Sequence, residues 1–208
     1  MDKNLILSFL IKNGINSKEI AEKFAKYINF LLLTNRKFNL VSFKDETEIL
    51  EVHIRDSLEF LKAENFSFKD KLKLIDIGSG AGFPGIPLGI VMDSWQVILV
   101  ESIRKKANFL NLAVKLINCS NIKIMNERAE NLSKNNEFRE KFDFASARWI
   151  SKGSAPLDLL APFVKKSGKI ALWKDPKELQ ELNNSRIEKV HSYQVDNRTK
   201  YIIFINKI

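Results

Sequence analysis

The chain has 208 residues, of which 45% are hydrophobic and 28% charged, so it can bury a substantial core. Its 34 Lys and Arg outnumber 25 Asp and Glu, and the net charge of +9 favours an anionic partner: RNA, DNA or, least of these, a membrane surface. One cysteine, Cys119, excludes an intramolecular disulfide, and two histidines leave no zinc-type ligand cluster. No signal peptide and no apolar run of about 18 residues is present, so we expect a cytoplasmic, metal-free protein.

The first third of the chain has helical periodicity. Apolar residues recur at helical spacing, and Ser17 is placed to cap the second predicted helix, although the full capping box is missing. A polar stretch over residues 64–71 follows, so we divide the chain into an N-terminal helical extension, 1–66, and a second domain, 67–208. The three predicted helices cover residues 3–13, 17–36 and 46–63.

The second domain alternates strands and helices, a pattern that predicts a mainly parallel α/β sheet with right-handed crossovers. Two further alternating segments, joined by residues 196–199, predict an antiparallel hairpin at one edge of that sheet. The predicted strands cover residues 72–77, 96–100, 122–125, 142–146, 168–173, 188–195 and 200–205, and the helices 86–92, 105–117 and 157–164.

A glycine-dense turn follows the first predicted strand. Gly78, Gly80 and Gly82 alternate there, and residues without a Cβ let the main chain close on a ligand and adopt positive φ. Asp76 stands two residues before the first glycine. In an open parallel sheet, ligands bind at the carboxyl ends of the strands, so the turn predicts a ligand pocket built from main chain.

Two cofactors compete for this pocket. Residues 80–85 match the dinucleotide pattern G-x-G-x-x-G, with Glu101 about 20 residues further on. Asp76 separates the candidates, because a carboxylate repels a pyrophosphate but attracts the ammonium of S-adenosylmethionine (SAM). Pro84 and Pro87 also remove N–H donors that a pyrophosphate needs. We therefore expect SAM, with a dinucleotide oxidoreductase as the alternative.

The residues that follow the other strands add candidate contacts. Glu101 ends the second strand, where a carboxylate can accept hydrogen bonds from both ribose hydroxyls of the cofactor. Ala129 and Glu130 follow the third strand and are candidates to flank the adenine. Arg148 follows the fourth strand, where the methyl group is delivered, and it can orient the cofactor or hold a phosphate. Trp149 beside it stacks on a base or packs in the core.

Three cations, Arg104, Lys105 and Lys106, begin the next predicted helix. The helix dipole disfavours positive charge at that end. Their placement favours an external anion, of which phosphate is the simplest, although three solvated side chains are the plainer interpretation.

Beyond the glycine turn, whose version over residues 76–88 includes Gly-Phe-Pro-Gly-Ile-Pro, the chain carries Phe-Asn-Leu-Val at 38–41 and His-Ile-Arg-Asp-Ser-Leu at 53–58. On these motifs the chain resembles, over nearly its whole length, the RsmG (GidB) family of bacterial methyltransferases. The resemblance implies the class I SAM-dependent methyltransferase fold, Rossmann-like and seven-stranded, and methylation of nitrogen 7 of a guanine in 16S rRNA of the small ribosomal subunit. The chain departs from the family pattern at Trp149 and over residues 173–176.

The resemblance also assigns site residues. Arg148 acts by positioning, and no general base is expected, since nitrogen 7 carries an unprotonated lone pair.

Two alternative functions remain: a methyltransferase that acts on another acceptor, and a non-catalytic assembly factor that binds SAM and RNA. We expect a monomer by default.

The resemblance implies that Gly78, Phe83, Ala129, Glu130 and Arg148 contact SAM, and the glycine turn and strand ends add Asp76, Gly80, Gly82 and Glu101. The RNA side comprises His53, Arg55, Asp56, Lys105, Lys106, Arg128 and Lys174.

Overall fold

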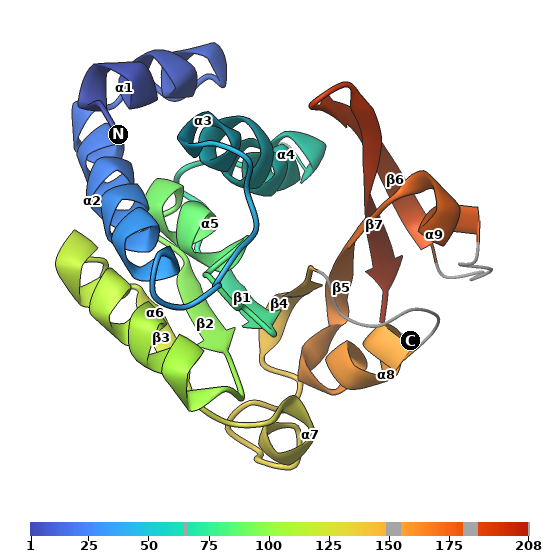
Figure 1. The fold of residues 1–208 in the computed structure, drawn as a ribbon. Coiled ribbons are helices and arrows are strands. Elements are labelled where there is room, and N and C mark those ends of the chain that lie inside the picture. The colour runs from blue at the N-terminus through green and yellow to red at the C-terminus, as the bar shows by residue number, and fades with distance from the viewer. Residues whose placement is uncertain (65, 149–154, 181–186, 208) are drawn as a thin grey trace.

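The computed structural model describes residues 1–64, 66–148, 155–180 and 187–207 (Figure 1). These residues form one seven-stranded sheet in the order β3-β2-β1-β4-β5-β7-β6, with helices on both faces. The strands are β1 (Lys73–Ile77), β2 (Gln96–Val100), β3 (Ile122–Met125), β4 (Phe142–Ala147), β5 (Val164–Lys174), β6 (Ile187–Val195) and β7 (Arg198–Asn206). The helices after β1 are α5 (Gly85–Val91), α6 (Arg104–Ile117), α7 (Ala129–Leu132), α8 (Ala155–Leu160) and α9 (Pro176–Gln180).

Strand directions confirm the predicted plan. Strands β3, β2, β1, β4 and β5 pair in parallel, whereas β7 lies antiparallel between β5 and β6. The chain leaves β1 toward β2 on one side and later returns to β4 on the other. A topological switch point therefore lies between β1 and β4, at the carboxyl ends of both strands.

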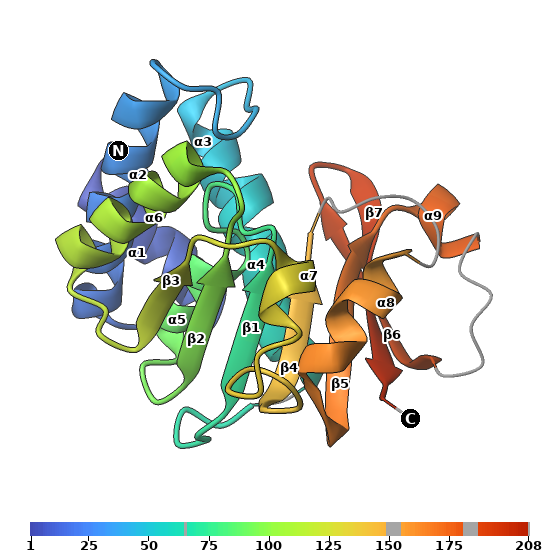
Figure 2. The same cartoon turned by 90° about the horizontal axis from the view of Figure 1, so that it is seen from below.

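The sheet is buried on both faces because its strands are apolar at successive positions. Along β1, Leu74 belongs to one hydrophobic cluster and Ile75 to the other, as the two-residue period of a strand requires. The larger cluster lies under α1 (Lys3–Lys12), α2 (Lys18–Asn35), α4 (Arg55–Glu64), α5 and α6, and the smaller one under α7 and α8 (Figure 2). The N-terminal helices therefore form part of the main core.

The N-terminal helices begin as predicted. They are α1 (Lys3–Lys12) and α2 (Lys18–Asn35), and Ser17 accepts a hydrogen bond from the Ile20 N–H at 3.2 Å, which confirms the predicted cap. The single helix predicted over 46–63 is instead α3 (Glu46–Glu48), a π-helical segment η1 (Ile49–Ile54) and α4 (Arg55–Glu64). The wider π turn shifts the helix face, and His53 is buried within it.

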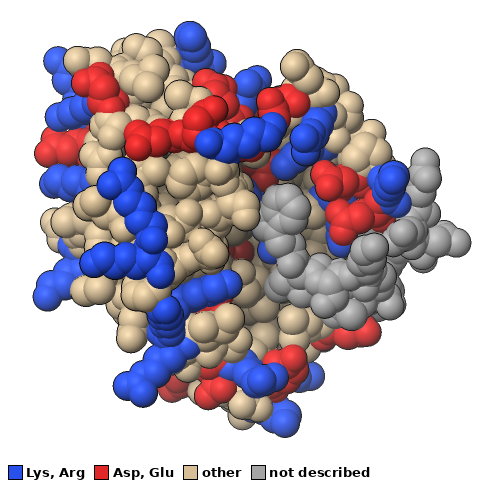
Figure 3. Space-filling model, viewed as in Figure 1, with Lys and Arg blue, Asp and Glu red and all other residues tan. Residues whose placement is uncertain are grey.

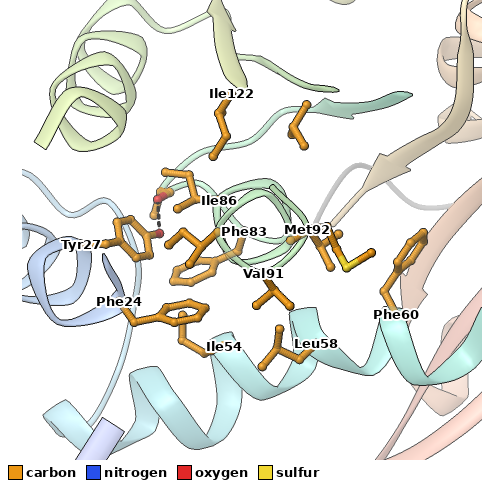
Figure 4. Close-up of a cluster of buried hydrophobic side chains, with 14 of the residues drawn as sticks. Phe24, Tyr27, Ile54, Leu58, Phe60, Phe83, Ile86, Val91, Met92 and Ile122 are labelled. Carbon is orange, nitrogen blue, oxygen red and sulfur yellow. Dashed lines mark hydrogen bonds between the residues drawn. The ribbon is translucent and has the colours of Figure 1, made fainter. Parts of the chain in front are cut away.

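Side chains of the N-terminal helices pack directly against the glycine loop and α5. Phe24 and Tyr27 of α2 and Ile54 of η1 surround Phe83, and Leu58 of α4 contacts the same cluster (Figure 4). The domain boundary between residues 66 and 67 stays a prediction, since one cluster holds residues from both sides of it.

Two sequence predictions about the C-terminal half are wrong. The helix predicted over 157–164 ends earlier, as α8 and a 3₁₀ turn (Ala161–Phe163), because Pro162 has no N–H and Val164 pairs with Phe142 in the sheet. The hairpin turn is two residues long, not four. Asp196 and Asn197 have φ of 51° and 56°, so β7 already begins at Arg198.

Among the described residues, no helix combines the length and apolarity that crossing a bilayer requires.

Candidate active site

A cavity of about 490 Å³ lies at the switch point, at the carboxyl ends of β1 and β4. This volume is within the range of small-molecule sites. The glycine loop forms one side, and the turn of the β6–β7 hairpin with the segment that follows α2 forms the other. The described lining residues are Asn39, Leu40, Val41, Ser42, Glu48, Val52, His53, Gly78, Ser79, Gly80, Ala81, Phe83, Lys106, Arg148, Val195, Asp196, Arg198 and Lys200.

The glycine loop has the backbone geometry that its sequence predicts. Gly78, Gly80 and Gly82 have φ of 71°, 58° and 105°. A Cβ at Gly82 would lie 2.5 Å from the Ile86 side chain, whereas one at Gly80 would meet nothing closer than 3.8 Å. The loop is therefore closely packed on its protein side and leaves the main chain at Gly80 open toward the cavity.

Two side chains hold this loop in place. The phenol of Tyr27, fully buried on α2, donates a hydrogen bond to the Ala81 carbonyl at 2.6 Å (dashed line, Figure 4). Burial raises the pKa of this phenol, so it remains a donor. The Glu101 carboxylate accepts hydrogen bonds from the Gly80 N–H at 2.9 Å and the Ile103 N–H at 2.8 Å. Glu101 thus supports the loop from the end of β2.

Asp76 lies beneath the loop. It is fully buried, and its Oδ1 accepts a hydrogen bond from the Ser146 hydroxyl at 2.9 Å. Its Oδ2 has no hydrogen-bond partner among the described residues and lies close to Gly85 at the start of α5. Burial raises the pKa of this carboxyl to about 6, and the Ser146 hydrogen bond opposes the shift. Asp76 is therefore a buried group whose charge a nearby cation would stabilise.

Arg148 is buried at the floor of the cavity. Its Nη1 donates to Asp56 Oδ2 at 2.8 Å, and its Nη2 lies 2.7 Å from His53 Nδ1. The guanidinium carbon is 5.1 Å from the centre of the Phe83 ring, on which His53 also stacks. The sequence predicted Arg148 as a cofactor or phosphate contact, and the structure places it in the cavity lining.

The tautomer of His53 follows from its two partners. Since Arg148 can only donate, Nδ1 of His53 accepts, and Nε2 donates to the Ser42 carbonyl at 3.1 Å. Burial, with the Arg148 charge beside it, lowers the pKa of His53 to about 4. The ring is therefore neutral at physiological pH and ties Arg148 to the segment that follows α2.

Asp56 joins the cavity floor to the C-terminal hairpin. Its carboxylate accepts a hydrogen bond from the Tyr193 hydroxyl at 2.6 Å, and Oδ1 lies 3.6 Å from Lys200 Nζ. Its main-chain carbonyl accepts from the indole of Trp173 at 3.0 Å. Burial and the adjacent Asp56 carboxylate raise the pKa of Tyr193, so its hydroxyl stays protonated. Asp56 thereby holds residues of β5, β6 and β7 around Arg148, through its carbonyl to β5 and its carboxylate to β6 and β7.

The structure brings some predicted site residues together and leaves others apart. Gly78, Gly80, Phe83, Arg148, His53 and Lys106 line the cavity, while Asp56, Asp76, Gly82 and Glu101 support it from behind. The remaining predicted site residues are not among the described residues that line the cavity. Ala129 is buried, whereas Arg128 and Glu130 are exposed.

The other three predicted residues contact different parts of the chain. Arg55 forms an ion pair with Glu51, Lys105 lies over the Phe38 ring, and the buried Lys174 forms an ion pair with Glu178. Trp149 lies outside the described residues.

Several residues of the site were not predicted from the sequence. Tyr27 fits the apolar stripe of α2, and nothing local indicates that its hydroxyl reaches residue 81. Tyr193, Asp196, Arg198 and Lys200 occupy a hairpin that the sequence assigned only to the sheet edge. Only the short Asp-Asn pair at residues 196–197 carries a local signal, that of a two-residue turn with positive φ.

Charge surrounds the cavity unevenly. In Figure 3, Lys and Arg side chains border the hollow in the middle of the face that carries the site, with acidic groups among them. Lys106, Arg198 and Lys200 belong to the described lining itself. This opening suits a polyanion better than a neutral ligand.

Comparison with known proteins agrees with this geometry. A SAM-dependent methyltransferase from Aquifex aeolicus has a TM-score of 0.58 at 18% identity, covering 77% of this chain and 93% of that one. A mutant of MtNAS in complex with S-adenosylmethionine has a TM-score of 0.61 at 14% identity, covering 99% and 78%. The fold and the glycine-loop site at its switch point define the class I SAM-dependent methyltransferases.

Sequence comparison identifies the family. The model for rRNA small subunit methyltransferase G (GidB) matches residues 20–203, and the chain belongs to that family. A ribosomal RNA small subunit methyltransferase G of Oenococcus oeni is 39% identical over 199 residues, covering 89% of this chain and 80% of the relative. That of Oceanobacillus iheyensis is 33% identical over 210 residues, covering 95% and 87%. The family resemblance inferred from the sequence motifs is confirmed.

Proposed function

We propose that this chain transfers a methyl group from SAM to nitrogen 7 of a guanine in 16S rRNA of the small ribosomal subunit. The observation that carries the proposal is the glycine-loop cavity at the switch point, walled by cations on its outer side and floored by a buried arginine. Family membership supports the same reaction.

The residues of the cavity fit the cofactor. The main chain at Gly78 and Gly80 offers a surface without side chains, and the partnerless Oδ2 of Asp76 beneath it supplies negative charge for the cofactor's ammonium. We assign Gly78, Gly80, Gly82 and Phe83 to cofactor binding by the loop, with Glu101 toward the ribose and Ala129 and Glu130 toward the adenine. SAM, when bound, supplies a sulfonium methyl group that an unprotonated ring nitrogen can accept.

The chain's own contribution is alignment. Arg148 is held by Asp56 and His53, so its guanidinium cannot swing away from the Phe83 ring. A fixed cation at this place orients a cofactor carboxylate or an RNA phosphate without taking part in proton transfer. Positioning of this kind lowers the barrier because the reacting groups lose little further freedom.

The acceptor side is the rim of the cavity. Lys106 lines the site, and Lys105 and Arg128 are exposed nearby on α6 and before α7. We propose that these cations take RNA phosphates, and that the chain works as a cytoplasmic monomer. The narrow major groove of A-form RNA hides nitrogen 7, so the target guanine is unpaired or opened.

The test is methyl transfer from labelled SAM to small ribosomal subunits and to deproteinised 16S rRNA, both taken from cells that lack this gene. Nuclease digestion and mass spectrometry identify the product. We expect a single 7-methylguanosine, and an Arg148→Lys variant that binds SAM with much reduced transfer. Methylation at another atom or of another acceptor contradicts the proposal, and SAM binding without transfer to either RNA form supports an assembly factor instead.

A further inference from the structure

Two carboxylates line the cavity among the described residues, Glu48 and Asp196. Glu48 is already engaged, because its Oε2 accepts a hydrogen bond from the Lys44 N–H in the segment before α3. No described residue donates a hydrogen bond to the Asp196 carboxylate, whose Oδ2 lies 4.0 Å from Lys44 Nζ. Asp196 therefore contributes to the cavity lining a carboxylate whose described partner is the exposed Lys44 ammonium, at ion-pair distance.

The backbone holds this carboxylate in a defined place. Asp196 and Asn197 form a two-residue turn with positive φ, closed by the pairing of Val195 with Arg198. Val195 is 1% exposed, and Tyr193, two residues before it, is hydrogen-bonded to Asp56. The exposed tip of the hairpin thus projects from an anchored base.

The geometry of the reaction dictates which part of the base faces the turn. If nitrogen 7 points toward the glycine loop, the Watson–Crick edge of the guanine points away from it, toward the opposite wall. That edge carries two adjacent donors, N1–H and the 2-amino group. A carboxylate, which has two acceptor oxygens, matches this pair of donors, and proteins commonly recognise an unstacked base through this edge.

We propose that Asp196 is a specificity-determining residue that accepts hydrogen bonds from N1–H and the 2-amino group of the target guanine; this inference rests on the proposed function. Adenine presents an acceptor at N1, which a carboxylate repels, so the same contact rejects it. Arg198 and Lys200 line the cavity beside Asp196 and offset the repulsion between its charge and RNA phosphates.

The experiment compares Asp196→Asn with the matched control Asp93→Asn, which neutralises an exposed carboxylate before β2, outside the described cavity lining. Both variants are assayed with a small-subunit RNA fragment that carries either guanosine or inosine at the methylated position. Inosine keeps nitrogen 7 and N1–H but lacks the 2-amino group. Readouts are the kcat/KM for methyl transfer and the Kd for SAM.

We expect Asp196→Asn to lower kcat/KM on guanosine RNA at least about 10-fold, the scale of a lost charge-assisted hydrogen bond. The Kd for SAM and the thermal midpoint of unfolding stay at their wild-type values, and Asp93→Asn transfers nearly as well as wild type. Wild type loses activity on inosine RNA, whereas Asp196→Asn loses less, since the contact with the 2-amino group is already gone.

Equal inosine penalties in wild type and Asp196→Asn would overturn the inference, as would full activity of Asp196→Asn on guanosine RNA. Failure of the wild type to methylate both the guanosine RNA fragment and small ribosomal subunits is a different result, because it overturns the proposed function itself.

Discussion

The two walls of the cavity are built differently. The loop wall, formed by Gly78, Ser79, Gly80, Ala81 and Phe83, is tied by hydrogen bonds to Tyr27 and Glu101 and packed on its protein side against Ile86. The hairpin wall, formed by Val195, Asp196, Arg198 and Lys200, is anchored at its base and exposed at its tip. A cofactor of constant shape suits the rigid wall, while a folded RNA suits a wall whose tip can adjust its side chains.

The largest expected loss of stability comes from a substitution at Asp56, whose side chain contacts Arg148 at the cavity floor and Tyr193 and Lys200 of the hairpin. Asp56→Asn removes the buried charge that neutralises Arg148 and approaches Lys200, and breaking a buried ion pair costs about 3–5 kcal/mol in the free energy of unfolding. Urea denaturation measures this change. Glu22→Gln, in an exposed pair with Lys3, is the control and leaves the urea midpoint close to that of wild type. A small effect at Asp56 would mean that the two walls do not depend on this carboxylate.

Tyr27→Phe disturbs the loop wall alone. The Ala81 carbonyl loses its buried donor, which costs about 1–3 kcal/mol, and the loop becomes less ordered. We expect weaker SAM binding, measured by calorimetry, with the kcat at saturating SAM close to wild type. Tyr201→Phe, on a half-buried side chain of β7, is the control. Unchanged affinity for SAM in Tyr27→Phe would show that the phenol serves packing only.

Lowering the pH is expected to change the free energy of unfolding in opposite directions through His53 and Asp76. The folded-state pKa of His53 is lowered to about 4, so the unfolded chain takes up the proton first, and stability is lost as pH falls from about 6.5 to 4. The folded-state pKa of Asp76 is raised to about 6, so the folded chain takes up the proton first, and stability is gained as pH falls from about 6 to 4.

Variants resolve these opposing contributions. Relative to His53→Gln, the stability advantage of wild type shrinks as pH falls through this range, and relative to Asp76→Asn it grows. Thermal unfolding followed between pH 8 and pH 4 tests both slopes. Parallel curves for either variant and wild type would contradict the shift assigned to that residue.

The smallest change in stability is expected from substitutions of the exposed lysines at the rim of the cavity, which we propose bind RNA phosphates. Lys105→Glu with Lys106→Glu leaves the fold intact and weakens RNA binding, lowering the dependence of log Kd on log salt by roughly 1.5 for two phosphate contacts. Lys141→Glu with Lys166→Glu reverses two exposed charges near the amino ends of β4 and β5, opposite the site, and is the control. Loss of SAM affinity in the first variant would assign these lysines to the cofactor wall.

The sequence predicted the loop wall better than the hairpin wall, for physical reasons. Positive φ at Gly78, Gly80 and Gly82 depends on local sterics, which glycine spacing reports directly, and Ser17 capping is equally local. By contrast, the hydrogen bond from Tyr27 to the Ala81 carbonyl joins residues that lie 54 positions apart in the sequence. The hydrogen bond from Tyr193 to Asp56 joins residues that lie 137 positions apart. No local sequence pattern indicates contacts over such separations. From the sequence alone, Tyr27 and Tyr193 therefore could not be distinguished from aromatic residues that only pack in the core.

The place of β7 between β5 and β6 also makes the hairpin wall depend on the last strand of the chain. The strands around the loop wall are β1, β2 and β4, whereas the hairpin wall needs β7 to pair beside β5. A truncation before residue 196 would therefore remove three charged side chains of the cavity lining, Asp196, Arg198 and Lys200, and would leave β5 as an unpaired sheet edge.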